Sequence, residues 1–316
     1  GLRPFFALTL PLMLAVGYSF VDQIIFSILG ARLDKLSVAA LNYAYRLMQV
    51  PVGALGIASA TAVIGTLAGL AANGEVVAFR RQVREALTRV AAMVLPVAAL
   101  MIVLAPAVVR VLLQRGEFTA DDTGRVAGIL RWFALGMYAW TANYVVSRAM
   151  YALKDTITPA ILSTLTTVVV VPLSFVLMRP MGAAGLALAT SLGISAQSLA
   201  IFLALRKRLR GLYVPAIARS LRRLTLAAVG MGAVCGALRW VLYQIPPRVG
   251  VLAPAAGHVA GALLELALVS GVGLCLFVRL SRALGDQEAA YLWETAVGGV
   301  RRRLARVLKR RRRVPA

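Results

Sequence analysis

Long apolar stretches follow one another along the chain, separated by short polar segments. Most are at least as long as the roughly 20 residues that a helix needs to cross a bilayer, and they lack the alternation of a membrane β-barrel. Inside lipid, a helix satisfies all of its own backbone hydrogen bonds. The pattern therefore predicts an all-α integral membrane protein with about eight transmembrane helices, at residues 5–30, 37–70, 87–113, 124–152, 158–179, 182–205, 221–244 and 252–280.

A shorter amphipathic segment precedes the third of these spans. The sequence EVVAFRRQVREALTR (75–89) has apolar residues at helical spacing, and its arginines fall mainly on the other side. We expect it to form an interfacial helix at the cytoplasmic surface, from which the chain then turns into the membrane.

Charge is distributed unevenly along the chain. The net charge of +23 comes from 35 basic and 12 acidic residues, while 60% of the 316 residues are hydrophobic. If the chain starts in the cytoplasm, 24 basic residues fall in cytoplasmic segments and seven on the opposite face. This positive-inside distribution predicts that both termini are cytoplasmic.

The end of the chain, RRRLARVLKRRRR (301–313), is strongly basic and carries a narrow apolar stripe. Each basic residue beside an anionic leaflet contributes about 1 kcal/mol of binding energy. We expect this tail to contact anionic membrane lipids, with a solvated charged end as the alternative. No nucleic-acid partner is expected.

Residues that usually carry catalysis or metal binding are scarce. Cys235 and Cys275 lie in separate expected spans, His258 is the only histidine, and the sequence has no phosphate-binding loop of the GxxxxGK type. We therefore expect no metal, no cofactor and no enzyme activity. The chain begins at Gly1, almost directly inside an apolar run, which suggests a partial or processed chain.

A polar face runs through the second expected span. Asn42, Arg46 and Gln49 are spaced four and three residues apart, so they share one side of a helix. Gly53 and Gly56 continue that side, and we expect them to leave room beside it.

Pro51 lies next to this face and removes a backbone hydrogen bond, so we expect a hinge at Pro51 and Gly53. An arginine inside a span costs about 2.5–3.5 kcal/mol on insertion scales and normally faces a cavity or a partner. A guanidinium on a roomy, bendable face suits an anionic substrate that carries phosphate. An Arg46 neutralised by an internal carboxylate, which only holds helices together, explains the same residues equally well.

Two acidic residues lie inside the expected spans, and one of them is a candidate partner for Arg46. Asp22 precedes the first expected loop by about as many residues as Arg46 follows it, which places both within roughly 2 Å in depth. We expect the two to form an ion pair when the cavity is empty. Glu265, in the outer half of the last span, is expected to be protonated or hydrogen-bonded. Three further arginines are expected to extend toward the membrane surface: Arg125, Arg131 and Arg148.

Three motifs of the chain are similar to those of one known family. They are NYAYRLMQVPVGALGIASATAV (42–63), LLQRGEFTADD (112–122) and SRAMYALKDTITP (147–159). The first resembles the signature helix of the MurJ (MviN) lipid II flippases, and the other two resemble turns of that family. Their order and spacing match the family's C-terminal portion, spans seven to fourteen.

This resemblance implies a MOP/MATE-like fold, in which two lobes enclose a cationic cavity and work by alternating access. Residues 1–206 would form the second transport lobe, 207–284 two additional spans with a lipid-tail groove, and 285–316 a basic cytoplasmic tail. The missing N-terminal lobe is then an expected partner, and the bacterial cytoplasmic (inner) membrane is the expected location.

The function that the resemblance implies is flipping of lipid II, an undecaprenyl-diphosphate-linked peptidoglycan precursor. Arg46 carries over as the residue that contacts the diphosphate, with Asn42 and Gln49 beside it. A chain without the first lobe is not expected to flip lipid alone.

Some members of the family hold a sodium ion between an acidic residue and polar residues on neighbouring spans. Asp22 and Thr190 match that pattern, whereas Val170 and Ser174 stand where stronger ligands are expected. The candidates for energy coupling are the membrane potential, H⁺ and Na⁺.

Two other functions fit parts of the pattern. Another MOP-superfamily exporter, such as a polysaccharide-lipid flippase or a multidrug transporter, would share the fold, although Arg46 opposes a cavity tuned to cationic drugs. A membrane enzyme that acts on polyprenyl diphosphates would normally need clustered acidic or histidine residues, which the sequence lacks.

The topology leads to the first prediction. We expect the loops at 31–36, 114–122 and 245–251 to be extracytoplasmic, since the basic excess lies on the other side. Cysteine-accessibility labelling checks this, and a result that places Lys35 and Arg208 on the same side would contradict the topology.

Overall fold

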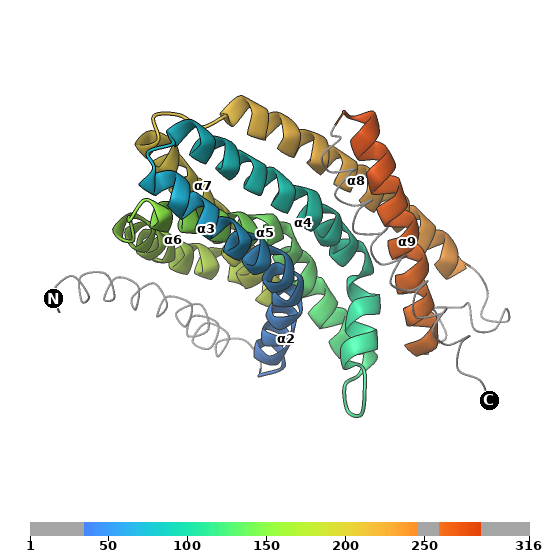
Figure 1. Ribbon diagram of the computed structural model, residues 1–316. Helices are drawn as coiled ribbons and strands as arrows, with labels where there is room; N and C mark the ends of the chain where they lie inside the picture. The colour runs from blue at the N-terminus through green and yellow to red at the C-terminus, as the bar shows by residue number, and fades with distance from the viewer. Residues whose placement is uncertain (1–34, 245–258, 286–316) are drawn as a thin grey trace, which may run out of the picture.

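The computed structural model describes residues 35–244 and 259–285, which form helices joined by short turns (Figure 1). The helices are α2 (Lys35–Pro51), the π-helical η1 (Val52–Ile57), α3 (Ala58–Ala72), α4 (Val76–Leu113), α5 (Ala120–Ala152), α6 (Ile157–Met181), α7 (Ala183–Arg208), α8 (Val214–Gln244) and α9 (Val259–Ala283). Within these residues, six helices are long and apolar enough to cross a membrane, the first being the continuous stretch Leu36–Ala72. The expected span 5–30, His258 and the basic tail lie outside the described residues.

α5 forms where the span 124–152 was expected, yet it is not among those six helices. It packs against α2, η1, α3, α4 and α7, so protein rather than lipid surrounds most of it. A helix in that position needs less apolar surface than one that faces lipid. Phe133, Met137 and Thr141 are fully buried along it, which makes α5 the centre of the bundle.

The separate interfacial helix expected over 75–89 is wrong. α4 runs without a break from Val76 to Leu113, and its 38 residues span about 57 Å, far more than the hydrocarbon core of about 30 Å. No proline or glycine lies between Val76 and Leu95, so nothing ends the helix there. Phe79, Val83 and Leu87 are buried as one stripe that continues into the span.

Two hydrophobic clusters divide the described helices. The larger one joins α2 to α7, with η1, and we call this part the core bundle. The smaller one joins α8 and α9, which we call the appended pair, to one side of α4. Figure 1 shows the appended pair beside α4, with α9 far from α6 and α7. The domain boundary near residue 206 stays a prediction, because the start of α8 packs in the larger cluster through Ile217.

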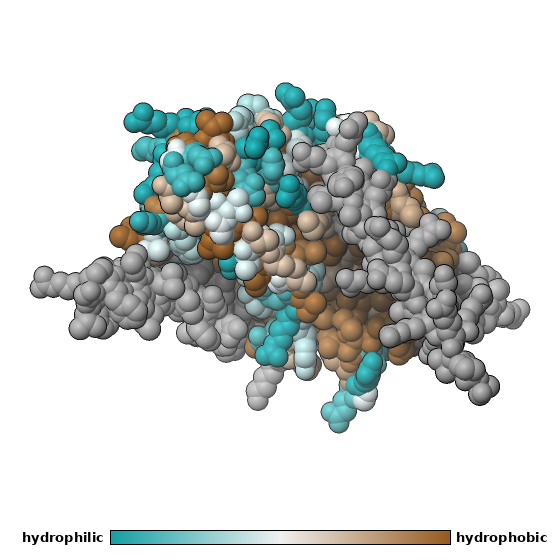
Figure 2. Space-filling model, in the orientation of Figure 1, coloured by the Kyte–Doolittle hydropathy of each residue, from teal (hydrophilic) through white to brown (hydrophobic). Residues whose placement is uncertain are grey.

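The surface shows where the membrane lies. In Figure 2 hydrophilic residues gather along the upper edge and at the tips of the lower edge, with apolar surface between them. Large apolar side chains are exposed on several helices, for example Val168 on α6, Leu199 on α7 and Val229 on α8. An apolar belt between two polar edges is the surface that a bilayer covers, so the chain is a multi-pass membrane protein.

Candidate functional site

The polar face expected in the second span lies on α2 and is followed by a local change of helix type. η1 begins at Val52, directly after Pro51, and its π-helical turns continue into α3. Proline removes one backbone hydrogen bond, and short π segments in helices are frequent at functional sites. The hinge expected at Pro51 and Gly53 stays a prediction, but the irregular backbone falls at that point.

Arg46 projects from the side of α2 that does not pack into the core bundle. Ala44 and Met48 are fully buried on the packed side, whereas Arg46 is exposed between Tyr43 and Val50, which are 43% and 69% exposed. No hydrogen bond or ion pair joins the Arg46 guanidinium to another described residue. Its expected partner Asp22 lies outside the described residues.

Asn42 and Gln49 lie beside Arg46, half-buried and already hydrogen-bonded. The Asn42 side-chain amide donates to the Val38 carbonyl at 3.0 Å, and that of Gln49 donates to the Tyr45 hydroxyl at 2.7 Å. The Tyr45 ring in turn meets the rings of Phe133 and Trp140 on α5 edge-on, with centroids 5.6 and 6.4 Å away. Gln49 and Tyr45 therefore fix the orientation of α2 on α5, and Arg46 is the member of the face without such a contact.

The two glycines that follow behave differently. A side-chain carbon added at Gly53 would meet no described residue within 4 Å, so this position is open toward that part of the chain. At Gly56 the same carbon would lie 2.7 Å from the Thr141 side chain on α5. The expectation that Gly56 leaves room beside the face is wrong, because its missing side chain lets η1 pack directly on α5.

Of the two residues expected to couple an ion, Thr190 lies on α7 and Asp22 lies outside the described residues. Thr190 is buried and its hydroxyl donates to the Leu186 carbonyl at 2.9 Å. Val170 and Ser174 are also buried, and the Ser174 hydroxyl oxygen has no partner among the described residues. The described part of the chain contains no cluster of three or more acidic, histidine or cysteine residues that would hold a metal. The role of Thr190 and Asp22 stays a prediction.

The motif at 112–122 forms the turn that starts α5. Gly116 adopts φ +63°, a conformation that favours glycine, and Thr119 caps the helix together with Asp122. The Thr119 N–H and hydroxyl donate to the Asp122 carboxylate at 2.9 and 2.7 Å, and these bonds hold the pKa of Asp122 below its ordinary value. Phe118 packs edge-on against Tyr43, with centroids 6.1 Å apart, and ties the turn to α2.

The motif at 147–159 likewise has a structural role. The Asp155 carboxylate accepts from the Thr158 N–H at 3.0 Å and from its hydroxyl at 2.9 Å, at the start of α6. Asp155 also pairs with Arg208 at the end of α7. Two of the three motifs thus shape turns and helix starts, while the first places an arginine on an exposed face.

A buried ion pair was missed by sequence reasoning. Arg239 of α8 donates through Nε to Glu265 Oε1 of α9 at 2.7 Å. Its Nη1 also donates to the Val103 carbonyl of α4 at 2.7 Å. Glu265 is only 3% exposed. An acidic residue inside an apolar span needs a partner, and this was the signal in the sequence that could have led to Arg239. Glu265 is hydrogen-bonded, as expected, but its ionic partner was not identified from the sequence.

Three arginines were expected to extend toward the membrane surface. Of these, Arg125 and Arg131 are exposed and Arg148 is half-buried.

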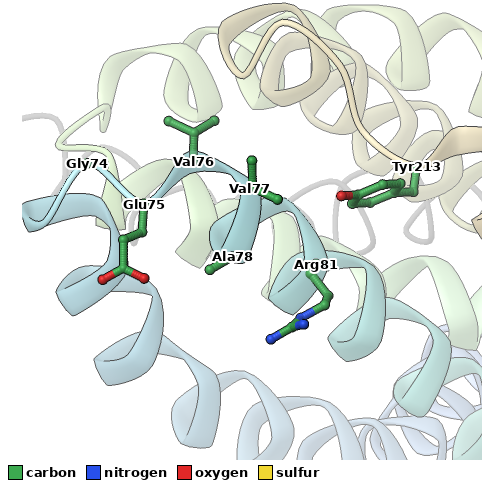
Figure 3. Close-up of a pocket in the computed structure, with 7 residues that line it drawn as sticks. All are labelled: Gly74, Glu75, Val76, Val77, Ala78, Arg81 and Tyr213. Carbon is green, nitrogen blue, oxygen red and sulfur yellow. The ribbon is translucent and has the colours of Figure 1, made fainter.

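Two pockets lie elsewhere on the described residues. The first, of about 550 Å³, is at the start of α4, where Figure 3 shows Tyr213 reaching from the α7–α8 connection toward that helix. The second, of about 370 Å³, lies between α8 and the core bundle, and its lining is mostly apolar. No residue of the α2 face lines either pocket.

Comparison with known proteins assigns the chain to a family. A family model described as lipid II flippase MurJ matches residues 1–247. The chain therefore belongs to the lipid II flippase MurJ family.

Individual relatives agree with this assignment. The chain is 28% identical over 239 residues to a probable lipid II flippase MurJ of Thermotoga maritima, covering 76% of this chain and 48% of that protein. It is 26% identical over 300 residues to a probable lipid II flippase MurJ of Rhizobium meliloti, covering 93% and 56%. It thus spans about half the length of the curated relatives it matches.

A solved structure shows the same fold. The structure described as lipid II flippase MurJ, inward closed conformation, superposes with a TM-score of 0.69 at 20% identity, over 89% of this chain and 54% of that chain. The expected fold class, an all-α integral membrane protein with a MurJ-like fold, is confirmed.

The Arg239–Glu265 pair leads to a second prediction. Replacing Glu265 with Gln should lower the free energy of unfolding by at most about 3–5 kcal/mol, because the Arg239 side chain, which is only 17% exposed, would lose its carboxylate partner. Replacing both residues with apolar ones of similar size should cost much less. Thermal unfolding in detergent measures both, and equal losses for the single and double variants would show that the two residues do not stabilise each other.

Proposed function

We propose that this chain provides the lipid-diphosphate-binding half of a lipid II flippase, with Arg46 as the residue that contacts the diphosphate. The observation that carries the proposal is the exposed guanidinium at mid-span on α2, which has no partner among the described residues. Membership of the MurJ family supports lipid II as the substrate, and it supports transport rather than catalysis.

The Arg46 side of α2 is exposed among the described residues. The chain covers 48% and 56% of the relatives compared above, so their full length includes a part that this chain does not match. We infer that the core bundle is the second lobe and that the first lobe faces α2, leaving a cavity around Arg46. A cavity filled with water or substrate removes the cost of keeping Arg46 charged inside the membrane.

The chemistry of Arg46 fits a diphosphate. Its planar guanidinium donates two parallel hydrogen bonds to one phosphate, and in a site of low dielectric such charge-assisted bonds are strong. Gln49 is oriented by Tyr45, and Asn42 lies one turn before Arg46, so both place amide groups beside the bound headgroup. Binding is reversed when the lobes move and water returns to the guanidinium.

Alternating access needs a helix that bends next to the binding residue. The π-helical η1, directly after Pro51, supplies weaker backbone hydrogen bonds there. Gly53 is open on its outer side, so a change in the angle between α2 and α3 meets no side chain at that position. Gly56 keeps η1 in contact with α5, which makes α5 the fixed support for the motion.

Energy coupling and orientation complete the proposal. The basic excess in segments such as 206–223 supports cytoplasmic termini and a location in the bacterial inner membrane. With the cytoplasm negative, outward movement of a lipid diphosphate is favoured by about 2.3 kcal/mol per charge per 100 mV. The alternative source of energy is protonation of Asp22, or binding of Na⁺ by Asp22 and Thr190.

The lipid tail is proposed to lie beside the appended pair. The apolar pocket of about 370 Å³, with Phe202 of α7 and Leu221 of α8 in its wall, suits a hydrocarbon chain. α5 lies between this pocket and the contact that Tyr45 makes, so a tail of a headgroup at Arg46 would have to pass around α5.

Replacement of Arg46 tests the function. In a protein that contains both lobes, Arg46→Ala should abolish growth of a flippase-depleted cell without lowering membrane abundance, since the residue supports no contact within the described fold. Arg46→Lys should rescue poorly, because a point charge does not reproduce the fork. Arg115→Ala, an exposed arginine of the 114–119 turn, is the matched control and should grow normally.

Binding of purified protein separates the alternatives. Lipid II should bind more tightly than undecaprenyl phosphate, and a cationic drug should not compete. Normal growth of the Arg46→Ala cell, or drug binding that displaces lipid II, would contradict the proposal.

A further inference from the structure

A second cationic site lies on the other side of α5, and it begins with a proline in α4. Pro106 has no N–H, so the carbonyl of Ile102, four residues earlier, lacks its normal helical donor. In a membrane an unsatisfied carbonyl costs several kcal/mol, so another donor is needed.

Two arginines from different helices supply donors at this level of α4. Arg131 of α5 donates through Nε to the Ile102 carbonyl at 3.2 Å. Arg239 of α8 donates through Nη1 to the next carbonyl, that of Val103, at 2.7 Å. Both guanidiniums are therefore held on consecutive carbonyls of one helix and lie close enough to repel each other.

The charges of this cluster do not balance. Glu265 neutralises Arg239 through their ion pair, but Arg131 has no carboxylate partner among the described residues. Arg131 is exposed, and its two Nη groups make no hydrogen bond to another described residue. The cluster thus presents one uncompensated positive charge with free donors at the surface.

The surroundings of the cluster are those of a membrane interface. Trp240, next to Arg239, is 66% exposed, and the Tyr243 ring lies 5.2 Å from the Arg239 guanidinium carbon. Trp and Tyr gather at the level of lipid headgroups. Leu135, one turn along α5 from Arg131, is 57% exposed and faces the same way. Exposed apolar and aromatic side chains around a guanidinium that has no carboxylate partner among the described residues indicate a surface that contacts lipid.

We propose that Arg131, held beside the Arg239–Glu265 pair, binds the phosphate group of a membrane lipid at the seam between the core bundle and the appended pair. The free Nη groups of Arg131 donate to the phosphate, and the phosphate screens the repulsion between the two guanidiniums. Because carbonyls already anchor both arginines, little side-chain freedom is lost on binding. A bound lipid would also hold α8 against α4 and α5 at this level.

This site is distinct from the α2 face. Arg131 and the Tyr45 contacts Phe133 and Trp140 are about 180–200° apart around α5, so α5 separates Arg131 from Arg46. A membrane phospholipid reaches the seam from the bilayer without entering the cavity of the proposed flippase. The inference therefore does not depend on lipid II transport.

Binding of phosphatidylglycerol to the purified complete protein, measured by native mass spectrometry, tests the proposal. Arg131→Gln should weaken binding about tenfold, or about 1.4 kcal/mol, and Arg131→Lys by less, because it keeps the charge. Arg125→Gln, which removes another exposed arginine of α5, is the matched control and should bind as the unmodified protein does. Diacylglycerol, which lacks phosphate, should bind weakly to all of them.

Further arms of the experiment identify the lipid and guard against misfolding. Inorganic phosphate reports the headgroup alone, and undecaprenyl diphosphate added to an Arg46→Ala protein shows whether a polyprenyl lipid uses the same arginine. Melting temperatures show whether each variant is folded. If Arg131→Gln is not folded, the phosphatidylglycerol affinity of Arg131→Lys tests the proposal instead. Equal phosphatidylglycerol binding by the folded Arg131 variants and the unmodified protein, or equal binding of diacylglycerol, would overturn the proposal. Because Arg46→Ala leaves the seam intact, loss of lipid II binding and loss of phospholipid binding are separate results.

Discussion

The cost of leaving a charge or a backbone carbonyl without a partner inside a bilayer governs this structure. Arg239 avoids this cost by pairing with Glu265 and donating to the Val103 carbonyl. Arg131 avoids part of it by donating to the Ile102 carbonyl, which lacks its helical donor because of Pro106. Arg46 has no such partner among the described residues. The contrast separates an arginine that joins helices from one that is available for a ligand.

α5 gives these charges their separate positions. Because protein surrounds most of it, α5 carries more polar residues than a fully lipid-facing helix would tolerate. One side contacts α2 through the packing of Phe133 against Tyr45, while the opposite side presents Arg131 toward α4. The functional face and the lipid-facing seam are thus two sides of one central helix.

Much of the fold could be predicted from the sequence because long apolar runs have one solution in a membrane. Described helices such as α6 and α7 begin and end within three residues of the runs that predict them. The break expected within α4, after residue 89, was wrong because a change from charged to apolar composition does not end a helix when no proline or glycine interrupts it. The Arg239–Glu265 pair could not be predicted, since it depends on how α8 and α9 align. The position of Arg46 on a polar face followed from spacing, but the packing of Gly56 on α5 required the tertiary contact.

The central claim is that Arg46 faces an aqueous, ligand-accessible cavity rather than lipid or a permanent partner. Accessibility of an Arg46→Cys variant in membranes of a protein with both lobes measures this directly, in a background where Cys235 and Cys275 are replaced. The account predicts rapid reaction with a water-soluble, charged thiol reagent and protection by lipid II. Absence of reaction with that reagent, together with reaction with a lipid-soluble one, would contradict it.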